Sequence, residues 1–156
     1  MTEIIVIAAV AKNGVIGKGG KIPWHIKEDF QHFKELTLGH PCIMGSKTYE
    51  SLPIKPLPGR ENIILNYDKS YKVPGAVVKS SFEEALKYCK GKGKVFICGG
   101  ASVYKLGVEV ADKLELTKLH KDYDGDVYFP EVDFKKWKLV KRNDKDDYSF
   151  LSYVRK

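Results

Sequence analysis

Cysteine is scarce in this chain of 156 residues, and its spacing predicts neither a disulfide framework nor a metal site. The cysteines are Cys42, Cys89 and Cys98, an odd number that contains no C-x-x-C pair and no metal-ligand spacing with a histidine. Cys42 and Cys98 lie in apolar runs, which indicates buried thiols in a reducing compartment. We therefore expect no metal cofactor.

Long apolar runs and clusters of basic residues are also missing. No run of about 18 apolar residues exists, which argues against a membrane-spanning helix. The N-terminus carries Glu3 and lacks the basic start and cleavage site of a signal peptide. The formal net charge is +7, but the basic residues are scattered singly and do not interleave with aromatic residues. We expect a cytoplasmic protein with a bias towards anionic ligands, and no membrane or nucleic-acid partner.

What the chain does contain is a regular alternation of apolar strands and helices. Hydrophobic residues make up 43% of the sequence, and residues 1–156 show no repeat or linker, so a single domain is expected. The expected fold class is α/β, with a mostly parallel sheet closed by a C-terminal antiparallel hairpin. Strands are predicted at 4–11, 42–45, 62–66, 73–79, 95–100, 113–119, 137–142 and 148–154, and helices after Pro23, at 81–90 and at 101–106, the last closed by Gly107.

An acid stands out in the first predicted helix, between Pro23 and Thr37. Ile26, Phe30, Phe33 and Thr37 form one apolar stripe at helical spacing, and Asp29 projects at the edge of that stripe, away from the charged face. A carboxylate in such a place costs several kcal/mol unless it is paired, so Asp29 is a candidate functional residue. The alternative is that Asp29 caps a loop or leans into water, and the helical pattern alone leaves both open.

Glycine and proline mark the other candidate segments. Gly14 to Lys21 is glycine-rich but lacks the G-x-G-x-x-G spacing, which favours a mobile flap over a phosphate cradle. Gly99-Gly100 follows a strand, where glycine lets the backbone approach a ligand or make a tight turn. Gly45 to Thr48 joins a strand to a helical turn and could hold a phosphate, although an ordinary helix start explains it as well. The acidic loop at 122–126 lacks the later glutamate of a calcium site.

Taken together, these motifs resemble those of dihydrofolate reductases, and the match runs from about Ile4 to Val154. Any one of the motifs is weak, but their order and spacing are specific. They are I-A-A near the start, V-I-G, P-W before the helix with Asp29 and Phe33, M-G-x-x-T at 44–48, P-L-P-G-R at 56–60, N-I-I-L, C-G-G-A-x-V-Y at 98–104, L-T at 116–117 and G-D-x-x-F-P at 125–130.

The resemblance implies a fold and a set of substrate-binding residues. The fold would be a mixed, mostly parallel eight-stranded sheet with flanking helices. Asp29 would pair with the pterin, Thr117 would hydrogen-bond Asp29, a water would join Trp24 to the acid, and Arg60 would bind the glutamate α-carboxylate of the substrate. Burial would raise the pKa of Asp29. The remaining substrate-binding residues would be Ile7, Ala8, Phe30, Phe33, Leu52 and Leu57.

The resemblance also implies an NADPH site. Gly99-Gly100 would form a cis peptide, the amides of Ala101, Ser102 and Val103 would face the pyrophosphate, and Tyr104 would lie near the nicotinamide. The flap residues would be Ala9, Ile16, Gly17, Lys18, Gly19, Gly20 and Lys21. The adenosine half would be held by Gly45, Ser46, Lys47, Thr48, Leu65, Asn66 and Tyr67, with Cys98 beside the site as a packing residue.

The implied activity is NADPH-dependent reduction of 7,8-dihydrofolate to tetrahydrofolate, which supplies one-carbon metabolism and makes such enzymes antifolate targets. A monomer is expected. Ser46 stands where many bacterial members have an arginine facing the 2′-phosphate, which leaves Lys47 as the nearest cation, and Ile22 replaces a common methionine. The alternatives are a pyrimidine reductase of riboflavin synthesis and a basic ligand-binding or RNA-binding module that does no chemistry. Asp29 with P-L-P-G-R favours folate over the first of them.

Overall fold

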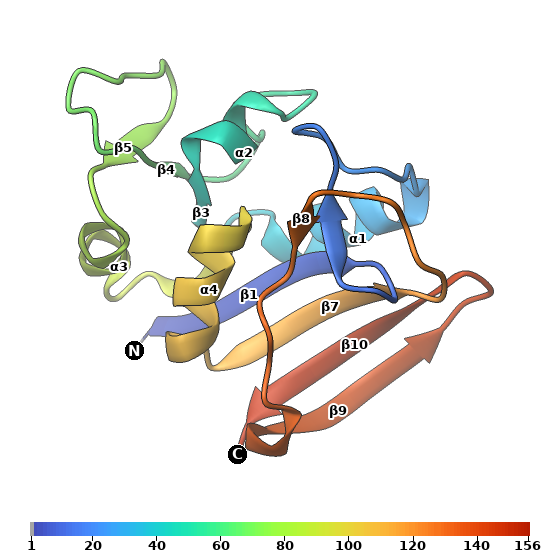
Figure 1. The fold of residues 1–156 in the computed structure, drawn as a ribbon. Helices are drawn as coiled ribbons and strands as arrows, with labels where there is room; N and C mark the ends of the chain where they lie inside the picture. Colours follow the sequence, from blue (N-terminus) through green and yellow to red (C-terminus); the bar gives the residue numbers. More distant parts are fainter. Residues whose placement is uncertain (1) are drawn as a thin grey trace.

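A twisted mixed sheet organises the computed structural model, which describes residues 2–156 (Figure 1). Over these residues the sheet has eight strands in the order β5-β4-β3-β6-β1-β7-β10-β9. Its strands are β1 (Thr2–Val10), β3 (Cys42–Gly45), β4 (Asn62–Leu65), β5 (Val77–Lys79), β6 (Gly93–Ile97), β7 (Lys113–Leu119), β9 (Trp137–Asp144) and β10 (Tyr148–Arg155). The helices are α1 (Lys27–Thr37), α2 (Ser46–Glu50), α3 (Phe82–Cys89) and α4 (Ala101–Val110), with a 3-10 turn at Phe134–Lys136.

The pairing confirms the mostly parallel sheet that the sequence predicts. The first six strands in that order, β5 to β7, run parallel, and β10 pairs antiparallel with both β7 and β9. Because the carboxyl ends of parallel strands meet at one edge, the segments that follow β3, β4 and β6 lie together. No helix among the described residues is both long and apolar enough to cross a membrane.

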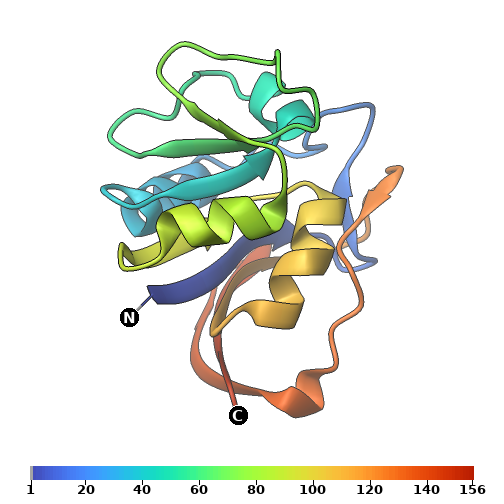
Figure 2. The same cartoon turned by 90° about the vertical axis from the view of Figure 1, so that its left-hand side faces the viewer.

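Two apolar clusters fill the opposite faces of the sheet. Alternate residues of β1 point to opposite faces, so Val6 packs with α3 and α4 while Ile5 and Ile7 pack with α1 and α2. Figure 2 shows α3 and α4 on the near face and α1 behind the sheet. The α3 helix begins as predicted, because the Ser81 hydroxyl accepts a hydrogen bond from the Glu84 amide at 3.1 Å.

Two predicted helix boundaries are wrong. The first helix begins at Lys27 and not directly after Pro23, since Ile26 has extended backbone angles. Gly107 does not close α4 but lies inside it, three residues before Val110. A Cβ at Gly107 would lie 2.9 Å from Ile97, so the glycine lets the helix pack closely against the sheet. Glycine at that position therefore reflects helix–sheet contact and not a helix end.

A small second sheet was not predicted from the sequence. It pairs β2 (Val15–Gly17), inside the predicted flap, with β8 (Val127–Tyr128), which follows the acidic loop. Lys18 Nζ lies 2.6 Å from Asp124, and the Gly19 amide donates to Asp126 at 3.3 Å. A Cβ at Gly125 would lie 2.4 Å from Val15, so only glycine allows this approach. The acidic loop thus holds the glycine-rich segment in place, and the mobility of that segment stays a prediction.

Candidate active site

Asp29 lies in the first turn of α1 and meets the central sheet at Thr117 of β7. The Thr117 hydroxyl donates to Asp29 Oδ1 at 2.6 Å, as the family resemblance implied. Burial raises the pKa of Asp29 above its ordinary value of 3.8, while Thr117 and His32 lower it by a smaller amount. Among the described residues, Thr117 makes the only side-chain hydrogen bond to this carboxylate. A half-buried acid with one bonded oxygen can still receive a donor from a ligand.

Thr117 is held rigidly because its strand lies inside the sheet. The residue is buried, and its Cα pairs with Ala9 on β1 and with Phe150 on β10. Trp24, just before α1, is also buried and packs edge-on against Tyr123, with ring centroids 5.0 Å apart. Thr117 and Trp24 are therefore both held in packed surroundings.

The predicted pterin-pocket residues divide between buried and exposed positions. Ile7 and Ala8 of β1 are buried, and Phe33, Leu52 and Leu57 pack half-buried against the same cluster as Ile7. Phe30, however, is 41% exposed, and its ring lies 5.1 Å from that of His25. The apolar stripe of α1 is therefore only partly covered by the sheet, and the assignment of Phe30 to the pterin pocket stays a prediction.

Arg60 is fixed before any ligand is considered. Its Nη1 donates to the Thr37 hydroxyl at 3.1 Å, its Nε donates to the Pro58 carbonyl at 2.9 Å, and its guanidinium carbon lies 5.9 Å from the Phe33 ring centroid. Thr37 is completely buried and donates to the Phe33 carbonyl at 2.7 Å. This role of Thr37 was missed from the sequence, although a hydroxyl residue on the apolar stripe was a visible signal.

A second group of candidates gathers at the carboxyl ends of β3 and β6. The peptide between Gly99 and Gly100 is cis, which confirms that expectation. Gly99 has a φ of +114°, and its carbonyl accepts from the Gly45 amide at 2.9 Å. A Cβ on Gly99 would lie 3.1 Å from Tyr104, and one on Gly100 would lie 3.2 Å from the Thr48 hydroxyl. Glycine thus leaves room beside the backbone.

The start of α4 adds hydrogen-bond donors to this glycine-lined space. Ala101, Ser102 and Val103 open the helix, so their amides lack partners within it, and Gly100 has no side chain that could cap them. Such a helix start attracts phosphate groups through its amides and dipole. The residues present therefore fit the pyrophosphate of a dinucleotide.

Tyr104 and Cys98 lie next to this region and pack against the sheet. The Tyr104 hydroxyl donates to the Ile7 carbonyl at 2.8 Å, which joins α4 to β1. Contact with the Cys42 thiol and burial hold the pKa of Cys98 well above its usual range. Cys98 also packs half-buried against the apolar cluster that contains Ile7, which supports the prediction that it is a packing residue.

The remaining cofactor candidates, in the flap and in the predicted adenosine half, make fewer contacts with one another. Lys18 pairs with Asp124, and Gly19, Gly20 and Lys21 are exposed, whereas Ala9, Ile16 and Gly17 are half-buried. The Asn66 side chain accepts from the Asp68 amide at 2.8 Å, and Tyr67 is 91% exposed. Leu65, Ser46 and Thr48 are half-buried, and Lys47 is exposed. A hollow of about 600 Å³ beside Asn66 is lined by several residues that include Lys69, Lys72 and Lys79.

Comparison with known proteins agrees with this geometry. Residues 3–155 match the family model described as dihydrofolate reductase. The chain is 43% identical to dihydrofolate reductase from Neisseria meningitidis serogroup A over 99% of both chains. It is 41% identical to dihydrofolate reductase from Bacillus subtilis, over 96% of this chain and 93% of the relative. The chain belongs to the dihydrofolate reductase family.

A solved dihydrofolate reductase extends the comparison to three dimensions. The enzyme from Enterococcus faecalis, complexed with NADP(H) and RAB-propyl, superposes with a TM-score of 0.91. Its sequence is 35% identical, and the match covers 98% of this chain and 96% of that one. Membership of the dihydrofolate reductase family separates this chain from the pyrimidine reductases and from the RNA-binding modules considered above.

Proposed function

We propose that this member of the dihydrofolate reductase family binds the pterin of 7,8-dihydrofolate on Asp29 and NADPH along the carboxyl ends of β3, β4 and β6. The family activity is NADPH-dependent reduction of dihydrofolate to tetrahydrofolate. The observation that carries the proposal is the Asp29 carboxylate, which is half-buried, bonded by Thr117 at 2.6 Å and raised in pKa by burial. A ligand that donates two hydrogen bonds to this acid would replace the water that burial removes.

Thr117 and Trp24 both act on Asp29 in this proposal. Thr117 is buried in the middle of the sheet, so its hydroxyl fixes the orientation of the carboxylate. Trp24 is buried and packs against Tyr123, and we assign to it a water that would join it to the acid. Both residues position the proton-binding group, and a carboxyl with a raised pKa can retain a proton nearer to neutral pH than an exposed one.

Arg60 supplies the charge for the other end of the substrate. Its hydrogen bonds to Thr37 and to the Pro58 carbonyl hold the guanidinium beside Phe33. A planar guanidinium binds a carboxylate through two parallel hydrogen bonds, and its fixed position lowers the entropy lost on binding. We assign it to the α-carboxylate of the glutamate moiety, with Phe30, Phe33, Leu52 and Leu57 around the rings between Arg60 and Asp29.

On the cofactor side, NADPH supplies the hydride, and the chain supplies binding and orientation. The helix start at Ala101 would face the pyrophosphate, and Gly45, Gly99 and Gly100 would give the cofactor backbone contact on that side. Tyr104, tied to Ile7, would support the nicotinamide half from beneath. Gly45 to Thr48, with Leu65, Asn66 and Tyr67, would hold the adenosine half.

Three broader statements belong to the same proposal. Residues 1–156 form one domain, the enzyme acts as a monomer, and it works in the cytoplasm as part of one-carbon metabolism. Two apolar clusters shared across one continuous sheet support the single domain.

The test is NADPH oxidation followed by absorbance, with dihydrofolate as substrate. We expect turnover that requires both compounds, and none when dihydrofolate is omitted. Circular dichroism of the same sample would establish that the protein is folded. Folded protein without dihydrofolate-dependent turnover would contradict the proposed function.

A further inference from the structure

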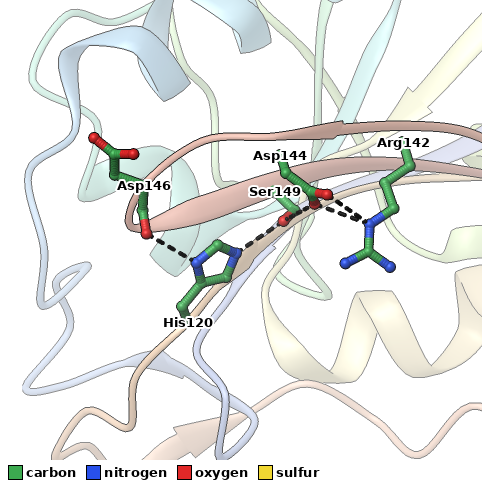
Figure 3. A network of polar contacts seen from close by, with 5 residues as sticks. All are labelled: His120, Arg142, Asp144, Asp146 and Ser149. Atoms are coloured by element: carbon green, nitrogen blue, oxygen red, sulfur yellow. Dashed lines mark hydrogen bonds and ion pairs between the residues drawn. The ribbon is translucent and has the colours of Figure 1, made fainter.

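A polar network at the end of β7 lies outside the site described above (Figure 3). His120, the residue after β7, reaches the tip of the β9–β10 hairpin through both of its ring nitrogens. Its Nε2 lies 2.8 Å from the Ser149 hydroxyl, and its Nδ1 lies 3.1 Å from the Asp146 carbonyl oxygen. The Ser149 hydroxyl in turn donates to Asp144 Oδ1 at 2.6 Å, and Arg142 donates to the same carboxylate at 2.9 Å.

The hydrogens in this network can be assigned by counting donors. Hydrogen bonds from Ser149 and Arg142 hold the pKa of Asp144 below its usual range, so that carboxylate only accepts at neutral pH. The single proton of Ser149 therefore goes to Asp144, and Nε2 of His120 must donate to Ser149. A carbonyl oxygen also only accepts, so Nδ1 must donate to Asp146. Both bonds exist together only when the His120 ring carries both protons.

Loss of one proton would break one particular bond. Ser149 is buried, so its hydroxyl cannot exchange His120 for water without cost. The Asp146 carbonyl lies in an exposed turn, where water replaces the ring easily. The neutral ring would keep its proton on Nε2, and the Nδ1 lone pair would then face the carbonyl oxygen. Deprotonation therefore releases the turn at 145–147 and leaves the β9–β10 pairing in place.

The charges around His120 come from three segments. The strand and loop that carry it hold Lys118 and Lys121, β9 holds Arg142 and Asp144, and the turn holds Lys145, Asp146 and Asp147. Burial lowers the pKa of Lys118. Among these groups, Asp144 is joined to the ring through Ser149, so it is the charge that most directly favours the protonated form.

The turn released in this way also touches α1. Lys145 Nζ lies 3.6 Å from Glu28, the residue before Asp29. The Tyr148 hydroxyl faces Glu28 too, and burial together with that carboxylate raises the pKa of Tyr148 to about 12. Tyr148 packs in the apolar cluster that contains Trp24. The hairpin tip therefore joins the end of β7 to the first turn of the helix that carries the candidate catalytic acid.

We propose that His120 is a proton-operated latch, which in its doubly protonated form fastens the β9–β10 turn to β7 and in its neutral form releases it. Since the charged ring makes one more hydrogen bond than the neutral ring, the latch stabilises the turn on the acid side. The stabilisation is lost when the ring gives up its Nδ1 proton as pH rises.

Amide hydrogen exchange between pH 5.5 and 8 tests this latch. Two backbone amides report on the turn. The Lys145 amide donates to the Tyr148 carbonyl at 2.8 Å, and the His120 backbone amide donates to the Asp147 carbonyl at 2.9 Å. After correction for the intrinsic pH dependence of exchange, we expect their protection in the wild type to fall about fivefold as pH rises, which corresponds to about 1 kcal/mol. Amides in the middle of β7 should not show this pH-dependent step in protection.

His120→Gln removes the titrating group but keeps one side-chain donor for Ser149. Its turn protection should be independent of pH, whereas the matched variant His40→Gln, which alters a histidine beside Phe96, should keep the wild-type step. In Asp144→Asn the new side-chain amide can itself donate to Ser149, whose own proton can then go to Nε2 of His120. The neutral ring would then keep its Nδ1 bond to Asp146, so the pH-dependent fall in protection should be lost. Wild-type protection that does not fall with pH, or an unchanged step in His120→Gln, would overturn the proposal.

Discussion

The two sides of the candidate active site are built in different ways. On the substrate side, side chains hold one another, with Thr117 on Asp29 and Thr37 on Arg60. On the cofactor side, glycines and backbone groups form the surface, with Gly45 bonded to Gly99 and the open amides of α4 next to them. One side therefore depends on charge and hydroxyl placement, and the other depends on the absence of side chains.

This difference has a physical reason. A pterin and a carboxylate present localised hydrogen-bonding groups, which a fixed carboxylate and a fixed guanidinium can recognise. A pyrophosphate spreads its charge over several oxygens, which a helix start and close backbone amides can meet without charged side chains. The two sides should therefore respond differently to mutation, the first to loss of a functional group and the second to the addition of even one carbon.

The largest expected effect is that of Asp29→Asn. The change keeps the shape but removes the charge and the exchangeable carboxyl proton, so we expect turnover at neutral pH to fall by about 10²-fold or more. NADPH affinity, measured by fluorescence titration, should stay near the wild-type value because Asp29 lies on the substrate side. The control is Asp122→Asn in the exposed acidic loop, which should keep its activity. Near-normal turnover of Asp29→Asn would refute the role of this acid.

The next effect concerns the glycine surface. Gly99→Ala adds a carbon that would lie 3.1 Å from Tyr104, whereas Gly91→Ala has nothing within 4 Å of its added carbon. Both glycines have positive φ values, +114° and +85°, so both changes carry the same type of backbone cost, about 1–2 kcal/mol. We expect NADPH affinity to fall about tenfold in Gly99→Ala only. Equal affinity in the two variants would mean that the close approach at Gly99 does not serve the cofactor.

A smaller effect is expected from Lys47, the cation that we expect to meet the 2′-phosphate. Lys47→Ala should weaken NADPH about fivefold and leave NADH nearly unchanged, because only NADPH carries the extra phosphate. Lys87→Ala on α3 is the matched control. If Lys79→Ala and not Lys47→Ala shows the selective loss, the phosphate is read in the hollow beside Asn66. Equal losses for both cofactors in every variant would exclude a lysine contact with the phosphate.

The smallest effect is that of Asp29→Asn on stability. This variant should lose activity but gain stability. Because the pKa of folded Asp29 lies above 3.8, ionisation of this acid destabilises the fold as pH rises from about 3.8 through the folded-state value. Asp29→Asn should therefore unfold at higher urea than the wild type at pH 7, because its free energy of unfolding is larger. Below pH 3.8 the two proteins should converge in stability. A variant less stable than the wild type at neutral pH would argue against a buried charge.

Much of the fold and part of the site were predictable because the signals are local. A short apolar run placed β3 and an alternating apolar pattern placed β7 at their observed bounds, and Asp29 was visible as an acid on an apolar stripe. The hydrogen bond from Thr117, 88 residues away, came only from the family resemblance. The small β2–β8 sheet joins two- and three-residue strands more than 100 residues apart, which no local pattern reveals.

Other residues were misread because one residue type serves several purposes. Gly107 looked like a helix end, but its role is to let Ile97 approach α4. Phe30 lies on the same helical stripe as Phe33, yet it is 41% exposed whereas Phe33 packs against the sheet. Thr37 looked like a filler of the stripe, while its hydroxyl joins α1 to Arg60. Such roles depend on what the fold brings alongside each residue.

The most direct test of the role given to Asp29 is the titration of its carboxyl carbon, followed by ¹³C NMR in the ligand-free protein. We predict a midpoint above 3.8, because burial outweighs the hydrogen bond from Thr117. Thr117→Val removes that hydrogen bond and should raise the midpoint further, whereas Asp122→Asn should leave it unchanged. A midpoint at or below 3.8 in the wild type would contradict this role, since Asp29 would then be an ordinary solvated acid.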